Sequence, residues 1–369
     1  MIAPASWGRR AAVLAGATGV VVAGAAVGLA AERYAVGRSF RGVVDPEADE
    51  PLGELHGTVI PTTADDGVRL QVEVDGPAPT ARRTPRVTVV FCHGLALSQA
   101  SWHYQRRDLG DLADENTRLV FWDQRGHGQS GRGAAEHATI DQLGRDLAAV
   151  ISAAAPRGPL VLVGHSMGGM TIMALAEQQP SLFAAGGRVI GVALICTSPG
   201  RLAEVTLGVP AAAGRALRRA APKVLASLDR RPTLVARGRD LGADIEFVLT
   251  KRYSFAGDVP PSLVRFASRM HEGTPLEVLA ELFPAFDAHD KLDALATFNG
   301  VETLIVGGEQ DRMTPADHSR AMVERVPGAE LVILPEAGHL LMLEQHDALT
   351  DLLRALVERA LRQAVKARG

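Results

Sequence analysis

Six short runs of mainly apolar, often β-branched residues, separated by segments with helical periodicity, constrain the fold of this chain most strongly. The runs are residues 87–91, 118–122, 160–163, 189–195, 301–306 and 331–334. They contain too few polar residues to line a solvent-exposed face, and strands of this kind occur in parallel sheets that are covered on both sides. Their alternation with helical segments predicts an α/β fold, with helices on both faces of a mostly parallel sheet.

The segments between the runs carry helix signals. Thr139-Ile-Asp-Gln142 has the spacing of a capping box, and the apolar residues between Leu143 and Ile151 fall on one helical face. Further helices are expected at residues 315–326 and 344–366. These segments supply the helical layers of the predicted fold.

Residues 58–61 and 68–74 flank Asp66-Gly67 and read as a β-hairpin. Apolar residues alternate with polar neighbours in its second strand, at Val68, Leu70, Val72 and Val74. This alternation predicts that one face of the hairpin is exposed to solvent.

Composition excludes several classes of protein. Hydrophobic residues make up 47% of the chain and charged residues 22%, which is typical of a globular protein. With 39 basic and 42 acidic side chains, the net charge of −3 argues against a nucleic-acid partner, because neutralising phosphates needs a basic surplus. Two cysteines are too few for a disulfide scaffold or a four-cysteine zinc site.

Residues 11–31 form 21 consecutive positions without a charged side chain, preceded by Arg9 and Arg10. As a helix this segment would span about 30 Å, the thickness of a bilayer core. We expect a membrane anchor that places the rest of the chain outside the cytoplasm. A cleaved export signal, which would give a secreted protein, and an Ala-rich helix of no targeting role are the alternatives.

The chain divides into five predicted segments. The hydrophobic segment 1–31 is followed by an acidic, proline-containing linker at residues 32–55. An α/β core at residues 56–200 and 291–369 is interrupted by residues 201–290, which lack a convincing buried strand and form a predicted helical cap. Helix-like stretches of the cap are residues 211–220, 241–249, 263–270 and 276–282.

Gly164-His-Ser-Met-Gly168 lies directly between the run at residues 160–163 and a helical segment. The G-x-S-x-G pattern alone is weak, but a strand, a sharp turn and a helix together are typical of a nucleophile elbow. The glycines leave room for the tight turn, and the helix N-terminus favours negative charge near the serine. The pattern predicts Ser166 as a nucleophile.

A nucleophilic serine needs a base and an acid that orients the base. Asp311 and His339 each follow a predicted strand, so both are expected at the carboxyl edge of the sheet, where α/β folds place their sites. The order serine, aspartate, histidine is the chain order of this type of triad. Rival acids are Glu309, Asp287 and Asp290.

His93-Gly94 follows the run at residues 87–91, an arrangement that suits an oxyanion hole. We expect the main-chain N–H groups of Leu95 and Met167 to be its donors. His93 itself is predicted to hold the loop by hydrogen bonds instead of acting as a base.

The segment Asp123-Gln-Arg-Gly-His-Gly-Gln-Ser130 is dense in charge, but we predict structural roles for it. Asp123 and Arg125 are expected to brace the ends of the loop. His127 is expected to be structural as well.

Together these motifs resemble the α/β-hydrolase family. They are His93-Gly94, Asp123-x-Arg-Gly-His-Gly, Gly-His-Ser-Met-Gly-Gly, Asp311 and Gly338-His339, and the similarity extends from about residue 57 to the C-terminus. The branch that the chain resembles holds capped esterases and lipases, haloperoxidases and epoxide-hydrolase-like proteins. The resemblance implies a mostly parallel, eight-stranded sheet with an inserted helical cap.

The resemblance also bears on the chemistry and on the cysteines. Epoxide hydrolases and haloalkane dehalogenases of this fold carry Asp where this chain has Ser166, so these two activities are not expected. In this fold the strands that end near Cys92 and Cys196 are separated by the nucleophile strand. Two inter-strand steps are about 9.6 Å, beyond the ~7 Å that a disulfide allows, so both cysteines are expected to be buried free thiols.

The implied activity is hydrolysis of a carboxylic ester of a lipid or another apolar acyl compound, through an acyl-enzyme on Ser166. Cofactor-free haloperoxidase (perhydrolase) or acyltransferase activity on the same triad, and a non-catalytic ligand-binding module, are the alternatives. No metal or cofactor is expected, and the partner is a small-molecule ester. Apolar candidates for the lining of the cap are Leu249, Phe255, Phe266 and Met270.

Overall fold

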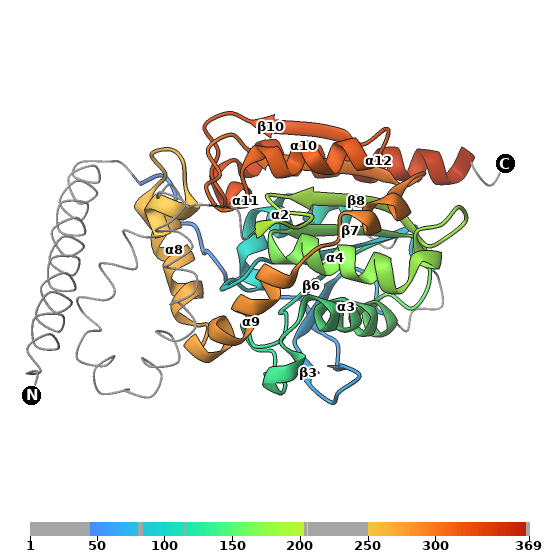
Figure 1. Cartoon of the computed structure of the whole chain (residues 1–369), viewed down its shortest axis with the longest axis horizontal. Coiled ribbons are helices and arrows are strands. Elements are labelled where there is room, and N and C mark those ends of the chain that lie inside the picture. The colour runs from blue at the N-terminus through green and yellow to red at the C-terminus, as the bar shows by residue number, and fades with distance from the viewer. Residues whose placement is uncertain (1–44, 80–83, 114–115, 203–204, 206–249, 367–369) are drawn as a thin grey trace, which may run out of the picture.

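The computed structural model describes residues 45–79, 84–113, 116–202, 205 and 250–366 (Figure 1). Its main sheet has eight strands in the order β1-β4-β6-β5-β7-β8-β9-β10. The strands of this sheet are β1 (Thr58–Val59), β4 (Val72–Asp75), β5 (Val87–Cys92), β6 (Thr117–Trp122), β7 (Leu160–His165), β8 (Val189–Ile195), β9 (Glu302–Gly308) and β10 (Glu330–Leu334). Strands β5 to β10 pair in parallel, and β1 and β4 add antiparallel pairs at one edge. The prediction of a mostly parallel, eight-stranded sheet is confirmed.

Helices cover this sheet. They are α2 (His103–Asp108), α3 (Ile140–Ala154), α4 (Met167–Gln178), α8 (Pro261–Glu272), α9 (Leu276–Ala288), α10 (Ala316–Arg325), α11 (Leu341–Glu344) and α12 (His346–Lys366). Short 3₁₀ turns are η1 (Gln99–Trp102), η2 (Gly110–Leu112), η3 (Ala135–His137), η4 (Pro180–Leu182) and η6 (Asp293–Phe298). The helices expected around residues 139–151, 315–326 and 344–366 are present as α3, α10 and the pair α11 and α12.

The two faces of the sheet bury two separate clusters because side chains alternate along a strand. In β5, Val89 and Phe91 pack in one cluster with residues of α2 and α12, such as Leu353. Val90 and Cys92 of the same strand pack in the other cluster, with residues of α3, α4 and α10. This double coverage explains why the strand sequences contain so few polar residues.

The hairpin near the N-terminal edge forms, but the expectation of a solvent-exposed face is wrong for β4, although Arg69 in β3 is exposed. Strand β1 pairs with β4, and β2 (Thr62–Thr63) pairs with β3 (Arg69–Leu70). Glu73, expected on the wet face, is buried. Its carboxylate accepts hydrogen bonds from Gly57 N at 2.9 Å and from Arg106 Nη1 at 2.8 Å. The partner Arg106 comes from α2, more than 30 residues away in the chain.

Helix α3 begins at the predicted capping sequence. Thr139 Oγ1 accepts a hydrogen bond from Gln142 N at 3.1 Å. The side chain of Gln142 turns to carboxylates instead, and its Nε2 donates to Asp65 Oδ1 at 2.7 Å and to Asp146 Oδ1 at 3.2 Å. The N-cap of α3 is therefore formed by Thr139.

Part of the predicted linker packs on the domain. Asp45 Oδ2 accepts a hydrogen bond from the main-chain nitrogen of Ser262 in α8 at 2.9 Å. Tyr104 Oη donates to Glu47 Oε2 at 2.8 Å, and Glu50 lies 2.7 Å from Nε2 of the buried His103. In Figure 1 the blue trace at the start of the described chain runs along α8. Residues 45–55 thus contact the domain directly and are not a free tether.

The insertion begins and ends at one place. Gly200 and Asp290 form an antiparallel bridge, and Lys291 N donates to Pro199 O at 2.7 Å. Two of the predicted helical stretches lie in α8 and α9, which Figure 1 shows in gold and orange. The other two, residues 211–220 and 241–249, lie outside the described residues, as does the lining candidate Leu249.

The predicted anchor at residues 11–31 also lies outside the described residues. Within the part of the chain that the structure describes, no helix has the length and apolar character needed to cross a bilayer.

Candidate active site

Ser166 occupies a strained turn between β7 and α4. Its φ is 51° and its ψ is −118°, a conformation that non-glycine residues rarely adopt. The turn is tight, because a Cβ on Gly164 would come within 2.6 Å of the main chain of Gly168 and Gly169. Only glycine fits at position 164, which explains the first glycine of the G-x-S-x-G pattern.

Hydrogen bonds hold the strained backbone of Ser166 in place. Its nitrogen donates to Ile195 O at 2.9 Å. Its carbonyl oxygen accepts from Thr197 Oγ1 at 2.6 Å. Ile195 ends the neighbouring strand β8 and Thr197 lies two residues beyond it, so this edge of the sheet holds the main chain of the serine.

The structure brings the three predicted triad residues together. His339 Nε2 lies 3.0 Å from Ser166 Oγ, and His339 Nδ1 lies 2.8 Å from Asp311 Oδ2. Asp311 follows β9 and His339 follows β10, as their positions after predicted strands suggested. Exposed fractions are 9% for Ser166, 5% for Asp311 and 4% for His339, so little water competes for these hydrogen bonds.

The Asp311 carboxylate is held by its own loop. Oδ1 accepts from Met313 N at 2.8 Å and Thr314 N at 2.9 Å, and Oδ2 accepts from Thr314 Oγ1 at 2.7 Å. Burial raises the pKa of Asp311, but interaction with His339 and the Thr314 hydrogen bonds outweigh it and lower the pKa below its ordinary value. Asp311 is therefore ionised at neutral pH and suited to orient an imidazole.

The rival acids do not occupy this position. Glu309, Asp287 and Asp290 are all exposed to solvent. Glu309 N donates to Leu334 O, which ties the Asp311 loop to the end of β10. Geometry therefore favours Asp311 as the partner of His339.

The predicted oxyanion-hole residues lie beside the serine. Met167 follows it as the first residue of α4. Gly94 packs so closely that a Cβ on it would be 3.2 Å from Ser166 Cβ, and a Cβ on Gly168 would be 2.8 Å from His93 O. Leu95 packs against the apolar cluster that contains Met167. The loop after β5 and the start of α4 thus meet at Ser166.

His93 is engaged with the main chain. Its Nδ1 donates to Gly94 O at 2.7 Å, and its Nε2 accepts from Gln124 N at 2.9 Å. Burial, with the charge of His127 second, lowers the pKa of His93 well below its ordinary value. His93 therefore joins the loops after β5 and β6, which is the structural role expected for it.

The charged loop after β6 is also internally braced. Asp123 accepts from Gln99 N at 2.7 Å and Gln129 N at 2.8 Å. Arg125 pairs with the buried Asp146 at 2.6 Å and with Asp66 at 2.9 Å. These contacts match the bracing roles that the sequence indicated.

His127 lies in the same loop. Its Nδ1 donates to Arg125 O at 2.9 Å. Burial lowers the pKa of His127 to about 4, so the ring stays neutral at physiological pH.

His165, which the sequence analysis did not single out, contacts the triad. It is fully buried, and its Nε2 donates to the main-chain oxygen of His339 at 2.8 Å. Burial and the neighbouring His339 lower the pKa of His165 to about 3. In the sequence, only the position of His165 between Gly164 and Ser166 could have indicated this contact.

The cysteines are free and buried, as expected. Strand β7 separates β5, which ends at Cys92, from β8, which precedes Cys196. Cys196 Sγ lies with Asp311 and His339 in a group whose ligand atoms are within 4.8 Å of one another. Burial and the nearby Asp311 raise the pKa of this thiol well above its ordinary value. A protonated thiol beside an already paired imidazole and carboxylate is a poor metal ligand set, and we assign no metal there.

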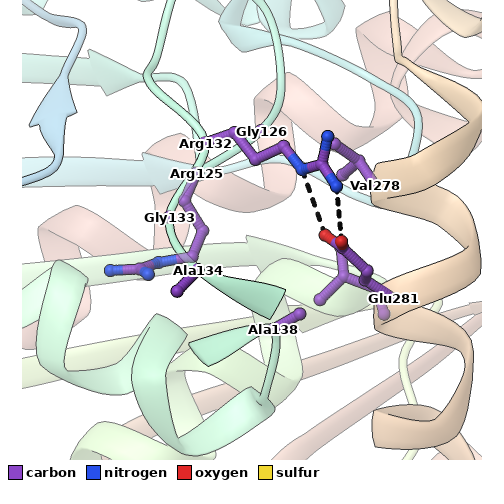
Figure 2. Close-up of a pocket in the computed structure, with 9 residues that line it drawn as sticks. Arg125, Gly126, Arg132, Gly133, Ala134, Ala138, Val278 and Glu281 are labelled. Atoms are coloured by element: carbon purple, nitrogen blue, oxygen red, sulfur yellow. Dashed lines mark hydrogen bonds and ion pairs between the residues drawn. The ribbon is translucent and has the colours of Figure 1, made fainter. Parts of the chain in front are cut away.

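The cap rests on the loop after β6. Figure 2 shows Arg132 of this loop and Glu281 of α9 facing each other across a small pocket, with Arg132 Nε 3.1 Å from Glu281 Oε2. A Cβ on Gly126 would be 2.8 Å from Val278 of α9, so this helix packs directly on the loop. Val278 and Leu282 belong to the apolar cluster that also contains Met167. Helix α9 of the cap therefore packs on the loop after β6 and shares an apolar cluster with the start of α4.

Comparison with known sequences identifies the family. A sequence model described as "Alpha/beta hydrolase family" matches residues 89–352, which include the serine, the aspartate and the histidine. The chain belongs to the alpha/beta hydrolase family.

Curated relatives named as lipases agree with the prediction of a carboxylic ester hydrolase, and a solved structure shares the fold. An sn-1-specific diacylglycerol lipase from Mus musculus is 26% identical over 68% of this chain and 74% of its own length. A monoacylglycerol lipase from Mycolicibacterium smegmatis is 24% identical over 72% of this chain and 83% of its own. The structure of an esterase from Thermogutta terrifontis superposes with a TM-score of 0.62 at 23% identity, over 83% of this chain and 99% of the esterase.

Proposed function

We propose that this hydrolase cleaves a carboxylic ester through Ser166, His339 and Asp311 and an acyl-enzyme intermediate. The observation that carries the proposal is the continuous hydrogen-bonded path from Ser166 Oγ through the imidazole to the carboxylate, at 3.0 Å and 2.8 Å. Distances of this size allow direct proton transfer between serine and histidine.

The proposed reaction has two halves. His339 Nε2 removes the proton of Ser166 Oγ as that oxygen attacks the ester carbon, and the carbonyl oxygen becomes an oxyanion. His339 then gives the proton to the leaving alcohol, and the acyl group remains bonded to Ser166. In the second half a water molecule gives a proton to the histidine and attacks the acyl carbon. His339 then returns this proton to Ser166 Oγ as the bond between that oxygen and the acyl carbon breaks, which releases the acid and the free serine.

The oxyanion is proposed to rest on the main-chain N–H groups of Leu95 and Met167. The close approach of Gly94 to Ser166 supports this placement, since it brings the loop that carries Leu95 within van der Waals distance of the nucleophile. Met167 opens α4, and the first amides of a helix are not used within the helix and favour negative charge. Two donors from different elements would make a rigid, preorganised hole.

The substrate class is proposed to be an apolar acyl ester, such as an acylglycerol. Apolar residues of α9 and of α4 form one cluster with Leu95 beside the serine. Phe255 and Phe266, considered as cap lining, are buried in the core cluster that includes strand residues, so they support the cap more than they line a pocket. Two relatives are named as lipases of diacylglycerol and monoacylglycerol, which favours the same class.

Residues 11–31 are proposed to anchor the enzyme to a membrane, with a secreted form as the alternative. A helix of this length and composition fits a bilayer core. Alkaline washing of membranes from cells that express the full chain tests it. Retention in the membrane supports the anchor, and release of the uncleaved chain to the soluble fraction contradicts it.

Hydrolysis of aryl esters and of acylglycerols with acyl chains from two to sixteen carbons tests the activity. The wild-type chain is expected to release free acid, and Ser166→Ala to lose at least ~10³-fold in kcat, by comparison with known triads. Adding hydrogen peroxide or an alcohol separates the other chemistries, because a peracid or a new ester then forms in place of the acid. Absence of every product from the wild-type chain contradicts the proposal.

A further inference from the structure

Glu344, the last residue of α11, accepts three main-chain hydrogen bonds outside its own helix. Its Oε1 accepts from Ala256 N at 2.9 Å and from Gly257 N at 2.7 Å. Its Oε2 accepts from Gly338 N at 2.6 Å. Neither the sequence motifs nor the proposed mechanism uses this residue.

These three donors belong to two different parts of the chain. Gly338 precedes His339 directly, so one carboxylate oxygen holds the loop that carries the base. Ala256 and Gly257 lie within the cap insertion, just before α8. Glu344 therefore joins the cap segment before α8 to the histidine loop.

Close packing reinforces the junction. Leu340 N, on the other side of His339, donates to Ser254 O at 2.8 Å. A Cβ on Gly338 would lie 2.7 Å from Ala256 N and 2.8 Å from the carbonyl carbon of Phe255. Residues 254–257 and 338–340 thus lie against each other, and the main chain on both sides of His339 is held by or against the cap segment.

Lys251, on the cap segment, lies near the turn that binds Glu344. Lys251 Nζ contacts the carbonyl oxygen of Gly257 and lies 3.9 Å from Asp258 Oδ1. Burial lowers the pKa of Lys251, although Asp258 and Glu344 act in the opposite direction. Lys251 thus binds the carbonyl side of the same turn whose amides bind Glu344.

We propose that Glu344 is a positioning residue for His339. It fixes the position of the imidazole relative to Ser166, and because it also binds the cap segment, this position depends on the cap. The inference rests on the proposed serine mechanism. Glu344 touches no reacting atom, so its effect passes through Gly338 to the distance between His339 Nε2 and Ser166 Oγ. A shift of about 1 Å in a catalytic group can cost on the order of 10²-fold in rate.

Glu344→Gln is the sharpest variant, because it keeps the shape but replaces one acceptor oxygen by a donor NH₂ that opposes an N–H group. Glu344→Ala removes both acceptors. Glu358→Gln is the matched control, since Glu358 is exposed on the neighbouring helix α12. All three are made in the full chain and compared with wild type.

The reaction of Ser166 with a fluorophosphonate probe is followed to completion. The end point measures the fraction of molecules with a competent site, and the rate constant measures activation of the serine by His339. We expect Glu344→Gln to reach the wild-type end point with a rate constant about 10- to 100-fold lower. We also expect kcat for a short aryl ester to fall by a similar factor with KM within about threefold, and Glu358→Gln to match wild type.

Three outcomes overturn the inference or its foundation, and they are distinguishable. If wild type is neither labelled nor active, the proposed function fails. If wild type reacts and Glu344→Gln keeps the wild-type rate constant, Glu344 does not position the base. If both Glu344 variants lower only the end point, in proportion to unfolded protein, the role of Glu344 is confined to stability.

Discussion

His165 Nε2 donates a hydrogen bond to the main-chain oxygen of His339 over 2.8 Å. The donor lies one residue before the proposed nucleophile, and the acceptor belongs to the proposed base. This single bond ties the nucleophile turn to the histidine loop across 174 positions of sequence. It also fixes the tautomer of His165, whose unprotonated Nδ1 lies toward Gly94.

Replacing His165 by alanine is expected to impair catalysis more than binding. The substitution leaves the buried carbonyl of His339 without its donor and opens space beside the base, so the histidine loop can shift. We expect kcat for an aryl ester to fall about 10- to 100-fold and KM to change little. Steady-state kinetics check this, with the folded fraction measured by circular dichroism. A wild-type kcat in folded His165→Ala would contradict the role.

Stability is expected to fall as the pH falls below 6.5, because buried histidines near the site cannot take up protons. The pKa of His127 is about 4 in the fold and that of His165 about 3, against an ordinary 6.5. Above pH 6.5 both histidines are neutral in the folded and in the unfolded state, so they do not make the free energy of unfolding depend on pH. Between pH 6.5 and about 4 the unfolded chain binds protons that the folded chain does not, so the free energy of unfolding decreases.

Asp123 acts in the opposite direction in part of this range. Burial raises its pKa to about 6, so the folded state takes up one proton before the unfolded state does. His127→Asn isolates one histidine and retains an amide donor for Arg125 O. The free energy of unfolding is measured with urea at pH 7, 6, 5 and 4. Its change per pH unit should be smaller in the variant than in the wild type by up to about 1.4 kcal/mol, the value for one proton. An equal change of the free energy of unfolding with pH in both proteins would refute the lowered pKa assigned to His127.

The acid of the triad can be tested against its rival in the same loop. Asp311→Asn is expected to lower kcat by about 10⁴-fold, because an amide holds the wrong tautomer of the imidazole. Glu309→Gln is expected to stay within about twofold of wild type, since Glu309 is exposed and its contact to Leu334 uses the main chain. Ester hydrolysis by the two variants decides between them. The reverse ranking would overturn the assignment of Asp311.

Asp45 is expected to stabilise the cap helix α8. The residue that precedes this helix is Pro260, whose side chain makes no capping hydrogen bond. Asp45 supplies the missing acceptor from a distant part of the chain, with Oδ2 2.9 Å from Ser262 N and Oδ1 2.8 Å from Ser262 Oγ. Asp45→Ala should lower the free energy of unfolding by about 1 kcal/mol, the usual effect of removing an N-cap. Chemical denaturation checks it, with exposed Asp49→Ala as control.

The strands, and the juxtaposition of Ser166, Asp311 and His339, could be predicted because their signals are local. A strand that is covered on both faces must be apolar throughout, as Val89 and Val90 illustrate by packing on opposite sides of the sheet. Ser166 was predictable because the strained turn requires glycine at position 164. Asp311 and His339 could be placed because each follows a strand, and parallel strands end at one edge.

Contacts between distant segments could not be predicted in this way. The burial of Glu73 depends on Arg106 of α2, which satisfies its charge, and strand periodicity says nothing of that partner. The acidic run at residues 45–50 resembled a solvated linker because Ser262 and Tyr104, which bind it, lie far away in sequence. Glu344 carried no motif at all, since its donors are main-chain amides that any sequence provides.

Identifying the residue that a fluorophosphonate probe modifies tests the central claim most directly. The full chain is labelled, digested and analysed by mass spectrometry, beside Ser166→Ala. We predict one probe adduct per molecule on Ser166, loss of ester hydrolysis in step with labelling, and neither labelling nor hydrolysis in the alanine variant. Hydrolysis that persists in Ser166→Ala, or an adduct on another residue that accounts for the loss of activity, would contradict the proposed mechanism.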